Sequence, residues 1–115
     1  MSDIKILTEA ILAFRDARDW KQFHNPKDVA VAVSLEAAEV LELFHWKSKE
    51  EVEAYVLTHR EEIGDELADV LYNLLLLAHE TGVDLVAASH RKMQKNIEKY
   101  PVEKARGKHT KYNKL

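Results

Sequence analysis

Apolar residues recur along most of the chain with the spacing of an α-helix, and no stretch shows the strict alternation of a surface strand. The first periodic stretch predicts a helix that is capped by Asp3 and runs toward Trp20. Its apolar positions, which are three to four residues apart, are Ile4, Leu7, Ile11 and Phe14.

A second helix is predicted to begin at Asn25-Pro26 and to run to about Trp46. Asn suits the N-cap, Pro suits the first helical position, and Asp28 places an acid in the first turn. The apolar side of this helix consists of Val33, Ala37, Val40, Leu41 and Phe44.

Ser48 and Glu51 have the spacing of a capping box, which predicts a short helix through Tyr55. A long helix is then expected over residues 61–80, with Gly82 as the glycine that ends it. Asp84 caps a last helix, which Pro101 closes. These elements predict an all-α fold, most simply a four-helix bundle.

Composition limits the remaining possibilities. A chain of 115 residues and 13.3 kDa has the size of one domain, which we expect over residues 1–107, followed by an irregular basic tail over 108–115. The absence of cysteine excludes disulfides, thiolate metal sites and cysteine nucleophiles. Neither a signal peptide nor an apolar run near the ~20 residues of a membrane span is seen, so a soluble, cytoplasmic protein without a membrane partner is expected.

The long helix changes character midway, from acidic to almost entirely leucine. One stripe along it is polar and comprises Glu62, Glu66, Asp69 and Asn73. The opposite side is apolar, can form the core, and comprises Leu67, Val70, Leu71 and Leu74. A second acid pair, Glu36 and Glu39, lies three residues apart in the helix before it.

Two helices that each carry an acid pair can direct four carboxylates to one point if they pack antiparallel. Such a group would raise its own pKa values or push the helices apart unless a divalent cation neutralised it. Oxygen ligands of this kind suit Mg²⁺, with Mn²⁺ as a substitute. The alternative is that each acid pair belongs to a solvated helix face.

The segments "EAAE" and "ELAD" resemble the E-x-x-E…E-x-x-D pattern of the MazG-like, all-α nucleoside triphosphate pyrophosphohydrolases. The segments "RDWKQFHNP", "ELFHWKS" and "KYPVEKARG" are similar to the dCTP pyrophosphatase branch of that family, so the resemblance covers nearly the whole chain. It implies Mg²⁺-dependent hydrolysis of a nucleoside triphosphate to the monophosphate and pyrophosphate, a house-cleaning role in the nucleotide pool, and a dimer or dimer of dimers.

The resemblance also implies roles for individual residues. Those that match the metal ligands are Glu36, Glu39, Glu66 and Asp69. Those that match substrate-binding positions are Trp20, His24 and Trp46 around the base, and Lys92 and Asn96 near phosphate or sugar. Glu36 or Glu39 is the candidate to accept a proton from the attacking water. Arg18 and Glu62 are weaker candidates.

Two positions depart from the family pattern. Leu35 precedes Glu36, where the classical motif has a second acid. Asn73, which we count among the substrate-binding candidates, stands where the dCTP branch tends to carry Tyr, so the base preference is open.

Two other classes of protein are alternatives. A ferritin-like di-metal bundle needs Glu-x-x-His on two helices, and only Glu42 and His45 have that spacing. A non-enzymatic helical interaction module would bind nucleic acid through the basic residues that gather from Arg91 onward. The enzyme is the preferred interpretation, and no nucleic-acid partner is expected.

Residues 74–78 are apolar on every side of the long helix. One chain of this size cannot enclose all of them, so another copy of the chain is expected to cover the remaining face, through Leu75 or Leu76. The sequence therefore predicts a homo-oligomer.

Overall fold

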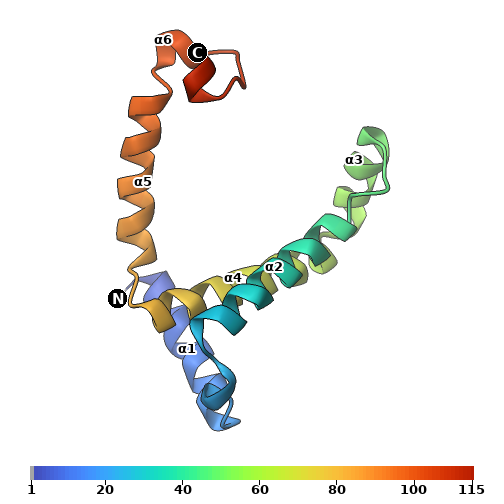
Figure 1. Cartoon of the computed structure of the whole chain (residues 1–115). Coiled ribbons are helices and arrows are strands. Elements are labelled where there is room, and N and C mark those ends of the chain that lie inside the picture. Colours follow the sequence, from blue (N-terminus) through green and yellow to red (C-terminus); the bar gives the residue numbers. More distant parts are fainter. Residues whose placement is uncertain (1) are drawn as a thin grey trace. The chain divides into compact units, whose positions relative to one another are not determined.

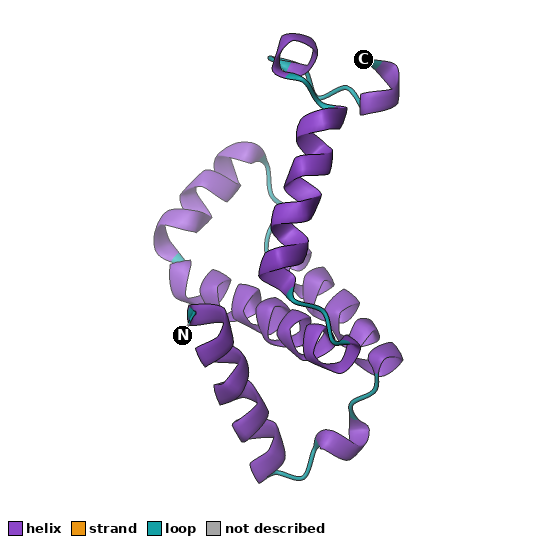
Figure 2. Ribbon diagram, turned by 90° about the vertical axis from the view of Figure 1, so that its left-hand side faces the viewer, coloured by secondary structure: helices purple, strands orange, loops and turns teal. Residues whose placement is uncertain are grey.

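The computed structural model of the protein describes residues 2–115, and these contain helices and no strand (Figure 2). This confirms the all-α prediction, whereas the four-helix bundle stays a prediction. The chain forms two compact units, one ending at Gly82 and one spanning Val83–Leu115, which are described separately.

The first helix, α1, spans Asp3–Ala17. Ser2, and not Asp3, is its N-cap, because the Ser2 hydroxyl oxygen accepts a hydrogen bond from the Lys5 N–H at 3.2 Å. The helix ends at Ala17, short of Trp20. Asp19, which lies between them, adopts a left-handed backbone conformation with φ 55°. A single 3₁₀ turn, η1, follows over Lys21–Phe23.

Helix α2 spans Pro26–Glu42 and begins as predicted, with the Asn25 side-chain oxygen accepting from the Asp28 N–H at 2.9 Å. It ends earlier than Trp46, because the last residues tighten into turns in which the Phe44 N–H donates to the Leu41 carbonyl.

Helix α3 spans Lys49–Thr58 and has both hydrogen bonds of the predicted capping box. It continues beyond Tyr55, the predicted end. Helix α4 spans Arg60–Thr81. It ends as predicted at Gly82, whose φ of 70° is left-handed and whose N–H donates to the carbonyl oxygens of Ala78 and His79 in the last turn.

Within the first unit, α2 and α4 lie side by side and antiparallel, and α1 crosses them (Figure 1). The most buried apolar side chains are Ile11, Val29, Leu75 and Leu76. The core therefore lies in the second half of α4, where α1 also packs.

The predicted core stripe of the long helix is largely wrong for the single chain. Leu67, Leu71 and Leu74 are exposed, and Val70 is half-buried. Conversely, Leu75 and Leu76, which were expected to meet another copy, are the two most completely buried side chains of their own chain. The pattern misleads here because residues 74–78 are all apolar, so the sequence gives no sign of which side faces inward.

In the second unit, α5 spans Leu85–Lys99. The predicted cap is confirmed, since the Asp84 carboxylate accepts from the Ala87 N–H at 3.0 Å. A short helix that was not predicted, α6, follows Pro101 over Val102–Ala105, and the tail contains only the 3₁₀ turn η2 over Tyr112–Lys114.

No single helix among residues 2–115 is both long enough and apolar enough to cross a membrane. Helices α4 and α5 are long and apolar enough only when they are counted as one continuous segment.

Candidate metal centre

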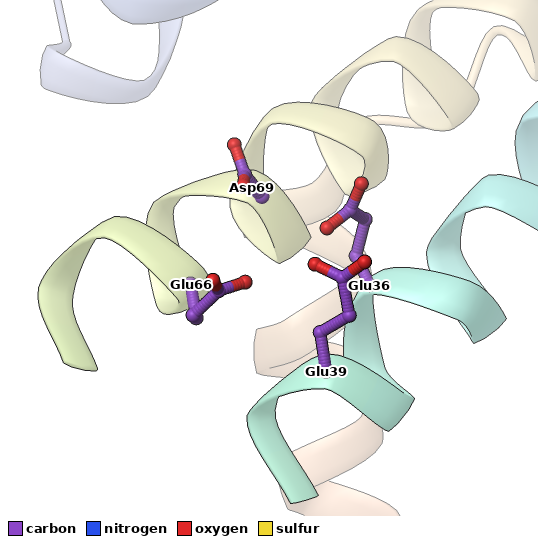
Figure 3. Close-up of side chains that lie close together, drawn as sticks. All are labelled: Glu36, Glu39, Glu66 and Asp69. Atoms are coloured by element: carbon purple, nitrogen blue, oxygen red, sulfur yellow. The ribbon is translucent and has the colours of Figure 1, made fainter. Parts of the chain in front are cut away.

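Four carboxylates gather between α2 and α4. Glu36 and Glu39 project from α2, and Glu66 and Asp69 from α4, in each case from positions one helical turn apart (Figure 3). Each side chain offers one oxygen such that all four oxygens lie within 4.8 Å of one another. The antiparallel packing thus brings together the two acid pairs that the sequence separates by some thirty residues.

The inner two carboxylates of this group are partly withdrawn from water. Glu36 and Glu66 are half-buried, and the Oε2 atom of each is buried without a hydrogen-bond partner. Burial, and then the charges of Glu39 and Asp69, raise the pKa of Glu36 above its ordinary value. Burial, and then the neighbouring Glu39, likewise raise the pKa of Glu66.

No basic side chain relieves this repulsion within the described part of the chain. The ion pairs found among residues 2–115 both involve Arg15, with Asp16 and with Glu80, and none reaches the four carboxylates. Buried carboxylate oxygens without donors, in a group without a counter-ion, are the arrangement that a divalent cation stabilises. The residues present therefore fit a hard cation with oxygen ligands, such as Mg²⁺ or Mn²⁺.

A cavity of about 540 Å³ lies beside the carboxylates. Its lining residues, all from the first unit, are Ala10, Ile11, Phe14, Trp20, Glu36, Asp69, Tyr72 and Asn73. The cavity is within the size range of small-molecule sites, and it joins an apolar wall to two of the four acids.

Three aromatic rings shape this wall. The Phe14 ring meets those of Trp20 and Tyr72 edge to face, with centroids 5.6 and 6.3 Å away. The Arg18 guanidinium lies 3.7 Å from the Phe14 centroid and covers that ring. Burial raises the pKa of the Tyr72 hydroxyl, although the charges of Arg15 and Arg18 oppose this effect, so the hydroxyl stays a hydrogen-bond donor at neutral pH.

Asn73 is held next to the acids by its own helix. Its side-chain N–H donates to the backbone carbonyl of Asp69 at 3.0 Å, one turn earlier in α4. This hydrogen bond keeps the amide on the face of the helix that carries Asp69, where it lines the cavity.

The chain is similar to known proteins in family, sequence and structure. The family model described as "MazG-like family" matches residues 31–115. The chain belongs to the MazG-like family. This membership confirms the resemblance seen in the acid pairs, and the matched range contains all four carboxylates.

Curated relatives and a solved structure agree with the MazG-like assignment. Over 104 residues the chain is 41% identical to dCTP pyrophosphatase 1 of Rattus norvegicus and 38% identical to that of Homo sapiens. These alignments cover 89% of this chain but 61% of each relative, so the chain spans less than two thirds of their length. A pyrophosphatase from Archaeoglobus fulgidus DSM 4304 superposes with a TM-score of 0.83 at 38% identity, over 88% of this chain and 94% of the other.

The structure brings some of the predicted substrate-binding residues to the cavity but not all of them. Trp20 and Asn73 line it, whereas His24 and Trp46 do not. Trp46 is 84% exposed, with its ring centroid 4.5 Å from that of His45. The Nδ1 atom of His24 is buried without a hydrogen-bond partner. The roles of His24 and Trp46 stay predictions.

Two further candidates belong to the second unit. Lys92 is exposed and Asn96 half-buried on α5, one turn apart. Their predicted contact with phosphate or sugar also stays a prediction.

Four lining residues of the cavity were not predicted from the sequence: the aromatic Phe14 and Tyr72, and the smaller Ala10 and Ile11. Phe14 was predicted only as an apolar position of its helix, and in the structure its side chain is exposed and lines the cavity. Tyr72 carried a usable signal, since it is an aromatic residue next to Asn73 on the acidic side of a leucine-rich helix.

Proposed function

We propose that this protein hydrolyses deoxynucleoside triphosphates to the monophosphate and pyrophosphate with the help of a divalent cation. The observation that carries the proposal is the position of the four-carboxylate group at the edge of an aromatic cavity. A nucleotide needs these two surroundings side by side, one for its charged phosphates and one for its base.

The names of the relatives support this reaction and indicate which nucleoside triphosphates are candidate substrates. Two are called dCTP pyrophosphatase 1, and the similar solved structure is called a pyrophosphatase. We propose deoxynucleoside triphosphates such as dCTP or dATP, including non-standard ones, as substrates. The role that follows is house-cleaning of the cytoplasmic nucleotide pool.

The base is proposed to enter the aromatic part of the cavity, against Trp20, Phe14 and Tyr72. Stacking of a base on an aromatic side chain contributes ~1–3 kcal/mol and tolerates different bases. His24 and Trp46 are further proposed contacts to the base, and Lys92 and Asn96 are proposed contacts to phosphate or sugar. Asn73, fixed by its hydrogen bond to Asp69, can present a directional polar group to the nucleoside.

The proposed metal ligands are Glu36, Glu39, Glu66 and Asp69. A bound Mg²⁺, or Mn²⁺ in its place, supplies charge neutralisation and lowers the pKa of a coordinated water. Water attacks the α-phosphorus, a new P–O bond forms, the bond from the α-phosphorus to the bridging oxygen breaks, and pyrophosphate leaves. Glu36 or Glu39 is proposed to accept the proton of that water.

A panel of ribo- and deoxyribonucleoside triphosphates, followed by chromatography of the products, tests this function. We expect a monophosphate and pyrophosphate in the presence of Mg²⁺, and no turnover in EDTA. A diphosphate and orthophosphate as first products would contradict attack at the α-phosphorus. Failure on every nucleotide would favour the interaction module, which an electrophoretic shift with DNA or RNA at low and moderate salt would then detect.

A further inference from the structure

Arg15 is the one charged residue that is fully buried among residues 2–115. Its Nη1 atom donates to Oε1 of Glu80 on α4 at 2.9 Å, where the side chains are 3% and 20% exposed. Its Nε atom donates to Asp16 at 3.0 Å, but Asp16 lies on the same helix and its side chain is 56% exposed. The ion pair with Glu80 therefore joins α1 to α4, and both of its side chains are largely shielded from water.

The backbone of Arg15 is tied to the cavity as well. Its carbonyl oxygen accepts hydrogen bonds from the N–H groups of Arg18 and Trp20, at 3.2 and 3.1 Å. The left-handed conformation of Asp19 turns the chain so that Trp20 can make this bond. The main chain of Trp20 is thus bound to a residue whose side chain is bound to α4.

The cavity depends on how α1 is placed against α4. Helix α1 supplies Phe14 and two smaller lining residues, and Trp20 follows it, whereas α4 supplies Asp69 and Tyr72. A shift or rotation of α1 along α4 would change the separation between the aromatic wall and the carboxylates. Arg15 directly follows Phe14 in the chain, so it is well placed to prevent such a shift.

We propose that Arg15 is a positioning residue, which through Glu80 fixes α1 and Trp20 against α4 and so sets how tightly the nucleoside is held. Arg15 itself lines neither the cavity nor the metal group. A buried ion pair is often no more stabilising than two apolar side chains of similar size, but its directional hydrogen bonds favour one register of the helices. This inference rests on the proposed function for its kinetic consequence alone.

The test uses variants that keep the shape of the pair. Glu80→Gln removes the charge and keeps an oxygen acceptor, Arg15→Lys keeps the charge and loses the planar fork, and Arg15→Met with Glu80→Leu replaces the pair by apolar side chains. Asp16→Asn is the matched control, because it removes the partner of Arg15 that does not join the helices. All variants are measured well below their melting temperatures, so that unfolded protein does not affect the kinetic or fluorescence values.

Two measurements separate positioning from stability. In nucleotide hydrolysis, we expect KM to rise about tenfold with kcat unchanged in Glu80→Gln and in the apolar double variant, because a misplaced wall weakens binding without touching the acids. Arg15→Lys should raise KM less than Glu80→Gln does, because the charge is kept. Asp16→Asn should leave KM at the wild-type value. The second measurement is acrylamide quenching of fluorescence in a Trp46→Phe background, where Trp20 is the only tryptophan. Quenching should increase in the same variants that raise KM.

The outcomes distinguish this inference from the proposed function. Unchanged KM and unchanged quenching in the folded double variant would overturn the positioning role, as would a fall in kcat with KM intact. If the wild-type protein hydrolyses no nucleotide, the quenching result still decides whether Arg15 positions Trp20.

Discussion

At the scale of single residues, what distinguishes the four proposed ligands from the other acids is their surroundings. The chain has 20 Asp and Glu residues, and most lie on solvated faces. Glu36 and Glu66 each contain a buried oxygen without a donor, which no purely solvated acid shows. The sequence predicted these residues because each pair is bordered by apolar neighbours and lacks a basic residue four positions further along the helix.

Neutral substitutions of the four acids test their role. Glu36→Gln, Glu39→Gln, Glu66→Gln and Asp69→Asn should each lower kcat/KM by about 100-fold or more, in the range produced by loss of a charge that acts on the transition state. Each variant should keep the helical circular dichroism spectrum of the wild type, because the amide preserves the shape of the side chain. Glu50→Gln and Glu53→Gln, on α3, are the controls. An equal loss at these exposed positions would show that general electrostatics had been mistaken for a site.

The raised pKa values of Glu36 and Glu66 predict how stability without metal depends on pH. A carboxyl whose folded pKa lies above its unfolded value favours the folded state below the unfolded pKa, and this contribution is lost as pH rises through the folded pKa. The loss should therefore begin near the ordinary Glu pKa of about 4.3 and continue above it.

Thermal melts in EDTA across this range, on the wild type and on a Glu36→Gln, Glu66→Gln double variant, measure the effect. The difference in Tm should grow in favour of the variant as pH rises, because the amides cannot become charged. Mg²⁺ should raise the Tm of the wild type alone, since a cation that binds only the folded state stabilises it. A constant difference in Tm across the pH range would contradict the coupling between these carboxyls.

At the scale of elements, helix starts were predicted better than the burial of helix faces. The side chains of Asn25, Ser48 and Asp84 accept hydrogen bonds from the first turns of their helices, as their residue types indicate. The end of α2 was placed too late because no Gly or Pro marks it. That end is set by a tightening of the backbone together with a hydrogen bond from Lys47 to the Leu43 carbonyl, which residue types do not reveal.

Gly64 inside α4 and Gly82 at its C-terminal end give opposite predictions for the same substitution. A Cβ atom would meet nothing within 4 Å at Gly64 or at Gly82, so neither change to Ala creates a clash. Gly64 lies inside the helix, where Ala should stabilise the fold by roughly 0.5–1 kcal/mol. Gly82 has φ 70°, so Ala there should destabilise the fold by about 1–2 kcal/mol. Urea unfolding of both variants checks this contrast, and a gain in stability at Gly82 would contradict the left-handed helix end.

At the scale of the whole molecule, the structure changes which leucines are available to a partner. Leu67, Leu71 and Leu74 lie at steps of four and three along α4, so they form one exposed apolar stripe, and Leu67 is 52% exposed. Leu75 and Leu76 are instead needed inside the chain. Periodicity could not make this distinction in a run of consecutive apolar residues, since the distinction depends on where α1 and α2 pack.

We therefore predict a homo-oligomer, a dimer or a tetramer, in which the stripe of Leu67, Leu71 and Leu74 is covered by another copy of the chain. Leu67→Lys and Leu71→Lys should dissociate the assembly, because a charge at the centre of an apolar contact cannot be buried without a partner. Multi-angle light scattering during gel filtration measures the change in mass, and circular dichroism should show that the helices persist.

Leu57→Lys on α3, whose leucine is 71% exposed, is the control and should stay assembled. Leu75→Lys should instead unfold the protein, because that side chain lies in the core. A wild-type protein that is monomeric at micromolar concentration and fully active would contradict the interface, and would show that one chain provides the whole site.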